Sequence, residues 1–199
     1  MTDAMVATAR NAGIAIEGWT SHEGPAAIQG PEDGAACIPP LLALVRKASA
    51  AGASAIIIGC FDDTGLDAAR AIANCPVIGV GQAAYHMAVL TGARFSVVTT
   101  LDVSVPILED NIRSYGFERQ LGRVRASGVP VLALETDPQA TLPIVIDEIK
   151  RAIAEDGVDC VVLGCAGMVM IPAIYRPESG VTLIDGVISA ARLAAVLSA

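Results

Sequence analysis

One short phrase occurs twice in this chain and constrains its fold more than any other feature. Residues 52–60 read GASAIIIGC and residues 157–165 read GVDCVVLGC, at an offset of 105 residues. Each copy is a short apolar run that follows a helical pattern, which is typical of a strand buried in a parallel sheet. Each run ends in Gly-Cys, which places Cys60 and Cys165 at the carboxyl ends of two equivalent strands. Open α/β sheets bind their ligands at that edge, so the repeat predicts a site built between two similar halves.

The rest of the chain alternates runs of β-formers with helical patterns, as βαβ units do. Strands are expected at residues 14–17, 55–58, 77–80, 95–99, 131–134, 160–163 and 181–184. Helices are expected at residues 39–51, 65–73, 82–91, 104–115, 138–155 and 186–198, with a further short helix at 168–175. The pattern predicts the α/β class, with two pseudo-symmetric parallel-sheet half-domains that face each other across a central cleft.

The repeat also predicts where one half-domain ends and the other begins. The first half is expected to cover residues 1–91 and the second residues 92–186, with the final helix at 187–199 folding back on the first half. Residues 1–12 read as an amphipathic helix with no strand before it, although an α/β half normally opens with a strand. The first half is therefore expected to lack its first strand, or the chain to be a shortened product.

Composition excludes several classes of partner. The net charge of −8 argues against nucleic acid and against anionic membrane surfaces. No segment has the run of about 18 apolar residues that a membrane-spanning helix needs, and no secretory signal pattern opens the chain. The five cysteines and two histidines show no metal-ligand spacing, so we expect no metal and reduced thiols in a cytoplasmic protein. Alanine-rich helix faces favour a homo-oligomer.

The turns that follow the two cysteines indicate proton-transfer chemistry on a small molecule. In both places the strand leads toward a helix start, where free N–H groups and the helix dipole favour an anion. Such a position is expected to lower a thiol pKa and so to make a usable base. The backbone of Phe61, Asp62, Ala166 and Gly167 would then hold the oxyanion of an enolate. Two facing thiols can take a proton from one face of a carbon and return one on the other.

Other polar residues near these strand ends have two interpretations. Thr99 and Thr100, at the end of another strand, either bind substrate or cap the next helix. Asp62, Asp63 and Asp67 are most simply N-capping or first-turn residues. The glycines of the Gly-Val-Gly at residues 79–81 lack the full dinucleotide fingerprint, so no nucleotide site is expected. A disulfide between the two cysteines is a minor alternative in a reducing compartment.

Several phrases around these residues resemble the aspartate/glutamate racemase superfamily, and within it the hydantoin racemase branch. The phrases are GCFDDTGLDAAR at 59–70, PVIGVGQAAYH at 76–86, RFSVVTT at 94–100, VPILEDN at 105–111 and VLGCAGM at 162–168. The resemblance implies a racemase that uses two cysteines and no cofactor, acts on 5-substituted hydantoins, and has close relatives that act on allantoin. It implies that Cys60 and Cys165 are the catalytic pair.

The chain departs from the family pattern at three places. The family opens with a strand and an Asn-Pro-Asn type loop, which this chain does not contain, and Gln29 and Gln82 stand where acidic residues are expected. Two alternatives in the same fold stay open, a maleate-isomerase-like enzyme in which a cysteine attacks carbon, and a non-catalytic small-molecule binder. The first predicts a covalent adduct on Cys60, and the second predicts binding without proton exchange.

Overall fold

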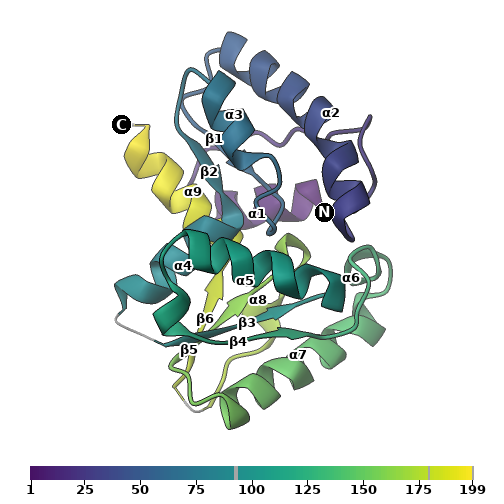
Figure 1. Ribbon diagram of the computed structural model, residues 1–199, viewed down its shortest axis with the longest axis vertical. Coiled ribbons are helices and arrows are strands. Elements are labelled where there is room, and N and C mark those ends of the chain that lie inside the picture. Colours follow the sequence, from purple (N-terminus) through teal and green to yellow (C-terminus); the bar gives the residue numbers. More distant parts are fainter. Residues whose placement is uncertain (92–93, 179, 199) are drawn as a thin grey trace.

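The computed structural model describes residues 1–91, 94–178 and 180–198, and it shows a mixed α/β protein with two separate sheets (Figure 1). The smaller sheet pairs β1 (Ile56–Ile58) with β2 (Val77–Gly79). The larger sheet has the order β4-β3-β5-β6, with β3 at Phe95–Thr99, β4 at Leu121–Ala126, β5 at Cys160–Leu163 and β6 at Thr182–Asp185. Every strand pair in the described residues is parallel, as the sequence predicts.

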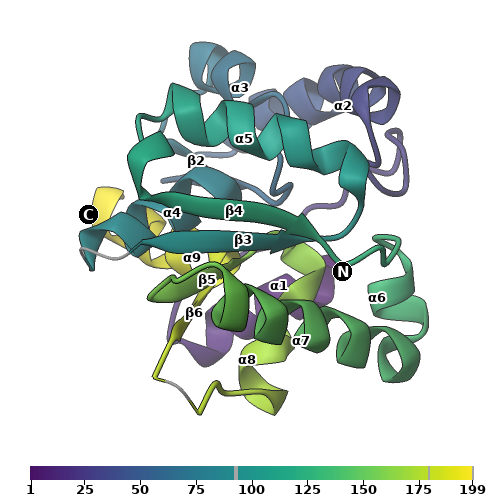
Figure 2. The same cartoon turned by 60° about the horizontal axis from the view of Figure 1, so that its bottom comes forward.

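Helices cover both faces of the sheets. They are α1 (Thr2–Asn11), α2 (Pro31–Ala50), α3 (Leu66–Ile72), α4 (Val80–Leu90), α5 (Val105–Ser114), α6 (Ala133–Thr136), α7 (Pro138–Glu155), α8 (Ile171–Ile174) and α9 (Gly186–Leu197). In Figure 1, α2 and α3 lie with the small sheet in the upper part of the molecule. Figure 2 shows α5 on one face of the four-stranded sheet and α7 on the other. Both sheets therefore lie between helical layers, which accounts for their apolar strands.

The internal repeat is confirmed as a structural repeat. One copy runs through β1, Cys60, α3, β2 and α4, and the other through β5, Cys165, α8, β6 and α9. The final helices of the two copies, α4 and α9, pack against each other. A core cluster that includes residues of both helices surrounds the fully buried Tyr85, whose ring lies 5.7 Å from that of Phe61 and 5.8 Å from that of Phe95. This core therefore joins the two copies of the internal repeat within the chain.

Two predicted strands are wrong, and one real strand was missed. Residues 14–17 form no strand pairs; residues 131–132 form a turn, and residues 133–134 already belong to α6. The sheet instead takes β4 as its edge strand, where Arg123 is exposed and Arg125 is buried in ion pairs with α7 and Asp156. An edge strand with charged residues does not give the apolar run by which the central strands were identified.

The first long helix begins eight residues earlier than predicted. The pair Pro39-Pro40 was interpreted as a helix start, but both prolines lie inside α2, which begins at Pro31. Proline suits the first helical turn, and Pro31 occupies it. Helix α2 continues through the two internal prolines because one of its faces packs on the small sheet. Cys37 and Val45 are buried on this helix.

The predicted boundary between the half-domains falls at residues 92–93, outside the described residues, so the division into 1–91 and 92–186 stays a prediction. Helix α9 contacts β1, β2 and α1, which supports the expectation that the residues from 187 return to the first half. Among the described residues, no helix has the length and apolar character needed to cross a membrane.

Candidate active site

Cys60 and Cys165 occupy the same position in the two copies of the repeat. Each lies two residues beyond the last residue of its strand, Ile58 in β1 and Leu163 in β5. The intervening Gly164 is required by close packing, because a Cβ there would lie 2.8 Å from both Val97 Cγ1 and the Val98 carbonyl oxygen. The Gly-Cys phrase therefore lets the chain pass close to its neighbour and then present a thiol at the carboxyl edge.

The loop after Cys60 is held by its own Thr64 and by residues of a later segment of the chain. The Thr64 hydroxyl lies 3.7 Å from Cys60 Sγ within this loop. Asn111 of α5 donates its amide N–H to the Asp62 carbonyl oxygen at 2.8 Å, and the Ser104 hydroxyl donates to the Asp62 carboxylate at 3.4 Å. The position of Cys60 thus depends on a segment some 40–50 residues further along the chain.

Asp63 anchors the same loop; the sequence predicted an N-capping or first-turn residue, and the structure shows that it caps α4, which the sequence did not indicate. Its carboxylate accepts N–H bonds from Gly81 at 3.0 Å and Gln82 at 2.7 Å, at the start of α4, and an O–H bond from Tyr115 at 3.0 Å. Asp63 is buried and has a φ of 52°, a left-handed conformation that aspartate tolerates better than most residues. It therefore joins the Cys60 loop to two other elements.

The Gly-Val-Gly phrase at residues 79–81 is explained by this carboxylate. A Cβ at Gly79 would lie 2.0 Å from Asp63 Oδ1, and a Cβ at Gly81 would lie 2.9 Å from Asp63 Oδ2. Both glycines leave room for the buried side chain that caps α4. The two glycines were the sequence signal that could have revealed the role of Asp63. Asp63 lies 16 or more residues before them in the chain, so the sequence did not show which side chain they accommodate.

Cys165 is held by the end of β3 and by its own turn. The Thr99 hydroxyl donates to the Gly164 carbonyl oxygen at 3.0 Å, and Gly167 N–H points at Cys165 Sγ from 3.4 Å. Cys165 serves as the N-cap of a short 3-10 turn at Ala166–Met168. Thr99 thus uses its hydroxyl hydrogen to position the strand end that carries this cysteine, and its predicted role as a substrate contact stays a prediction.

The remaining predicted binding residues lie around the same two loops. Phe61 and Ala166 are buried, Phe61 within the core cluster, so they can offer a ligand their backbone rather than their side chains. Thr100 is buried, and its hydroxyl donates to no group within residues 1–91, 94–178 and 180–198. These side chains were predicted as substrate contacts, and that role stays a prediction.

The expectation of lowered thiol pKa values is wrong for the unliganded protein. Burial is the largest influence on both thiols, and it raises the pKa of Cys60 to about 12 and that of Cys165 to about 11. Backbone N–H groups lower both values, but neither cysteine directly starts a long helix, since α3 begins six residues after Cys60 and only a 3-10 turn follows Cys165. Desolvation of the charged form therefore outweighs the helix-start effect.

A single carboxylate influences both thiols. After burial, the charge of Asp62 is a smaller influence that raises the pKa of Cys60 and also that of Cys165. Burial in turn raises the pKa of Asp62 to about 6, against the smaller opposite effect of the Ser104 hydroxyl. Asp62, whose own pKa depends on its burial, therefore influences the thiols of both copies of the repeat.

This arrangement predicts slow alkylation of both cysteines at neutral pH. Because a thiolate reacts and a thiol does not, the iodoacetamide rate at Cys60 and Cys165 should rise about tenfold per pH unit between pH 7 and 10. The Asp62→Asn variant removes a charge that raises both pKa values, so the alkylation rates of both cysteines should begin to rise at a lower pH. The control variant Asp67→Asn, at an exposed side chain, should leave this pH dependence unchanged. Peptide mapping by mass spectrometry measures each rate, and rates already maximal at pH 7 would contradict the raised pKa values.

Comparison with known proteins identifies the family. The family model for Asp/Glu/hydantoin racemases matches residues 1–194. The chain belongs to this family. It is 49% identical over 173 residues to a hydantoin racemase of Rhizobium meliloti, covering 87% of this chain and 72% of the relative, and 37% identical over 171 residues to that of a Pseudomonas strain, covering 86% and 69%.

A solved allantoin racemase from Klebsiella pneumoniae is 36% identical and superimposes with a TM-score of 0.93, over 98% of this chain and 81% of that one. The protein is therefore an enzyme of the isomerase class, and its fold is the one that the resemblance to the racemase family implies. Within the described part of the racemase, no group of three or more histidine, cysteine, aspartate or glutamate residues is placed to hold a metal ion.

Replacement of Asp63 should weaken both the fold and the site of this racemase. An Asp63→Asn side chain keeps the volume but has one acceptor oxygen in place of two, so Gly81 N–H or Gln82 N–H loses its partner. Leaving such a group unpaired costs about 1–3 kcal/mol, which corresponds to a melting temperature lower by roughly 2–10 °C. Thermal unfolding measures the loss, with Asp67→Asn as the control. Equal melting temperatures for the two variants would show that Asp63 is not an anchor.

Proposed function

We propose that this protein racemises 5-substituted hydantoins, with Cys60 and Cys165 as the two proton-transfer groups. The observation that carries the proposal is the placement of two thiols at equivalent strand ends, two residues beyond β1 and β5. The hydantoin racemases to which the chain is 49% and 37% identical support the substrate class. A neutral ring suits the surroundings of Cys165, where the Gly167 N–H lies 3.4 Å from the sulfur.

In the proposed reaction one cysteine acts as a base and the other as an acid. The C5–H bond of a hydantoin lies next to the C4 carbonyl, so loss of this proton gives an enolate. A thiolate on one face takes the proton and becomes a thiol, while the thiol on the other face gives its proton to C5 and becomes a thiolate. Backbone N–H groups such as that of Gly167 stabilise the enolate oxygen as its charge develops. The next turnover then proceeds in the opposite direction, or after proton exchange with water.

A second candidate substrate is allantoin, which is a hydantoin with a ureido group at C5. The similarity to the Klebsiella allantoin racemase, at 36% identity and a TM-score of 0.93, favours it. The same proton transfer serves both substrates, so the two proposals differ only in which C5 substituent the site prefers. Polarimetry with single enantiomers of allantoin and of alkyl and aryl hydantoins measures this preference. A higher kcat/KM for allantoin than for every other hydantoin would replace the first proposal with the second.

The proposed reaction requires two thiols and no metal or organic cofactor. We propose a cytoplasmic setting, in which the five free cysteines stay reduced.

We also propose a homo-oligomer, supported by the exposed side chains of Leu90, Val196 and Leu197 at the ends of α4 and α9. We propose no nucleic-acid or membrane partner, on the ground of the acidic charge. Light scattering on the purified protein, together with activity before and after EDTA treatment, tests the assembly and the metal independence.

A further inference from the structure

The segment from β3 through α5, residues 95–115, contacts the loops of both cysteines. Its first contact is with Gly164, the residue before Cys165. The Gly164 N–H donates to the Val98 carbonyl oxygen at 2.8 Å, and the Thr99 hydroxyl donates to the Gly164 carbonyl oxygen at 3.0 Å. Thr99 is only 1% exposed, so this bond is shielded from water. The Thr99 hydroxyl therefore fixes the orientation of the peptide that leads into Cys165.

The second contact is with the turn that follows Cys60. The peptide that joins Asp62 to Asp63 is bound at both of its polar groups. Its N–H donates to the Cys60 carbonyl oxygen at 3.1 Å, and its carbonyl oxygen accepts an N–H bond from the Asn111 side chain at 2.8 Å. On either side of this peptide, the N–H groups of Asp62 and Thr64 bond to the Cys60 sulfur and lower the pKa of the thiol. The Asn111 amide therefore orients the turn whose N–H groups face this sulfur.

Asn111 lies on one face of a helix that the core holds in place. Residues 104, 111 and 115 are spaced by seven and four, so they share one side of α5 and its flanks. Ser104 and Tyr115 also donate hydrogen bonds to the Cys60 loop, at 3.4 Å and 3.0 Å. The opposite contacts of α5 are apolar, since Leu108 and Ile112 are fully buried in the core. The helix is therefore a fixed support for the loop.

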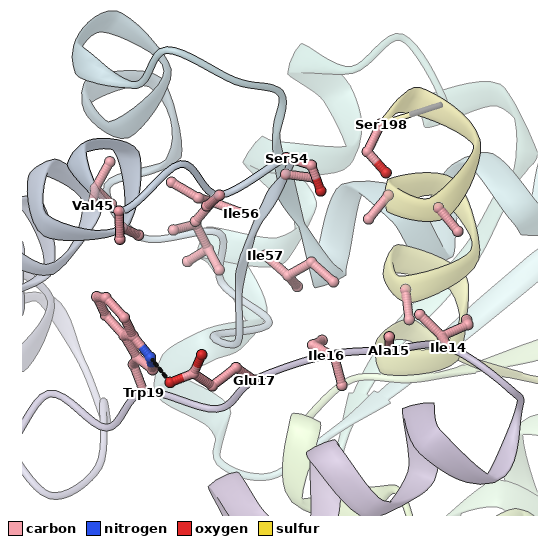
Figure 3. Close-up of a pocket in the computed structure, with 18 of the residues that line it drawn as sticks. Ile14, Ala15, Ile16, Glu17, Trp19, Val45, Ser54, Ile56, Ile57 and Ser198 are labelled. Atoms are coloured by element: carbon pink, nitrogen blue, oxygen red, sulfur yellow. Dashed lines mark hydrogen bonds between the residues drawn. The ribbon is translucent and has the colours of Figure 1, made fainter.

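We propose that Asn111 is a positioning residue for Cys60, and that Thr99 is the corresponding positioning residue for Cys165. Both belong to one continuous segment, which thereby sets where each thiol stands relative to the substrate carbon. The inference rests on the proposed two-thiol reaction and adds the residues that hold each acid–base group in place. The apolar groove of about 630 Å³ along β1 is lined by other residues, so neither side chain acts through it (Figure 3).

The test removes one hydrogen-bond donor at a time and keeps the shape of the side chain, in Asn111→Leu and Thr99→Val. Each variant displaces one thiol, and a shift of about 1 Å can cost about a hundredfold in rate, so kcat/KM should fall by about tenfold or more. The loss must be equal for both enantiomers, because the equilibrium constant of a racemisation is one. The rate alone therefore does not tell which thiol has moved.

Deuterium uptake in D2O identifies the displaced thiol. When the intact thiol removes the C5 proton and the displaced one delivers slowly, the enolate returns to the starting enantiomer and takes up deuterium there. Asn111→Leu should therefore label the same enantiomer as Cys60→Ser, which lacks that thiol. Thr99→Val should label the opposite enantiomer, the one that Cys165→Ser labels. Proton NMR and chiral separation measure both.

Ser114→Ala is the matched control, because the Ser114 hydroxyl lies on α5 and donates to the Asn111 carbonyl oxygen within the helix. It should racemise at the wild-type rate and leave the starting enantiomer unlabelled. Loss of activity in Asn111→Leu with deuterium in both starting enantiomers, or in neither, would indicate a general loosening of the site and would overturn the proposal. Labelling of the same enantiomer by Asn111→Leu and Thr99→Val would overturn it as well.

Alkylation by iodoacetamide at fixed pH tests the same positioning without substrate. Asn111→Leu should change the rate at Cys60 by about threefold or more and leave that at Cys165 within about twofold, and Thr99→Val should do the reverse. Rates that change together, or that both stay at the wild-type value, would overturn the proposal. A wild-type protein that racemises neither hydantoins nor allantoin would overturn the proposed function, and the alkylation rates would still decide whether these two residues position the thiols.

Discussion

Cys60→Ser and Cys165→Ser should each lose racemase activity by about a thousandfold or more. A general base or acid typically contributes about 10²–10⁴-fold, and a serine hydroxyl is far too weak an acid to replace a thiol in either role. Each variant keeps one thiol, so each should still exchange the C5 proton of one enantiomer with solvent deuterium. The two variants should prefer opposite enantiomers, because the two thiols approach opposite faces of the carbon. Polarimetry and proton NMR measure the two effects.

Cys75→Ser provides the matched control for these variants. Cys75 is a free cysteine just before β2, and it lies away from both Gly-Cys loops in the sequence. This substitution should leave racemisation unchanged. A Cys60→Ser or Cys165→Ser protein that racemises both enantiomers at near wild-type rate would mean that one base suffices. A stable covalent adduct on Cys60 after incubation with substrate would point instead to attack on carbon.

Arg125→Met should destabilise the protein by about 3–5 kcal/mol, the usual cost of removing one partner from a buried ion pair. Arg125 and Asp156 are only 8% and 6% exposed, and Arg125 also pairs with Glu148 and Glu155 of α7. Burial opposes ionisation of Asp156, but the hydrogen bonds from Arg125 and Ser96 keep its pKa below the usual 3.8. Urea denaturation at pH 7 measures the loss. Arg123→Met, an exposed residue of the same strand, should cost little.

The same ion pair gives a pH dependence with a defined sign. Because the pKa of Asp156 is lowered by folding, its contribution to stability is present above about pH 4 and is lost as the pH falls through the folded value. The difference in unfolding free energy between wild type and Arg125→Met should therefore narrow below pH 4. A difference that stays constant from pH 7 down to pH 3 would show that lost packing of the arginine stem, rather than the ion pair, accounts for the effect.

The central strands and the two cysteines were predictable because their signals are local. An apolar run that ends in Gly-Cys marks β1 and β5 in the sequence, and its repetition relates Cys60 to Cys165. Strand β4 was missed because Arg125 is buried only through its ion pairs with residues of α7 and with Asp156, which no local pattern shows. The strand predicted at 131–134 is a turn followed by the start of α6, and its apolar character reflects Leu134, which is buried in a core cluster with Val98 and Val161.

The chemistry of the site was less predictable than its location. Asp63 caps a helix that begins 17 residues later, and it also contacts Tyr115, so its role depends on the folded chain. The thiol pKa values were predicted in the wrong direction, because burial is a property of the whole fold and exceeds the local effect of the N–H groups. Sequence patterns therefore predicted where the two cysteines lie, whereas the direction of their pKa shifts became clear only from the structure.

The most direct test of the two-thiol account follows the C5 proton in D2O, starting from one pure hydantoin enantiomer. Early in the reaction, proton NMR and chiral separation should show that the product enantiomer carries deuterium while the remaining substrate still carries hydrogen, after subtraction of the uncatalysed exchange. This result is expected because the thiol that delivers the proton has exchanged with solvent and is not the thiol that removed it. Product that retains the original hydrogen, or substrate that gains deuterium as fast as product forms, would contradict the account.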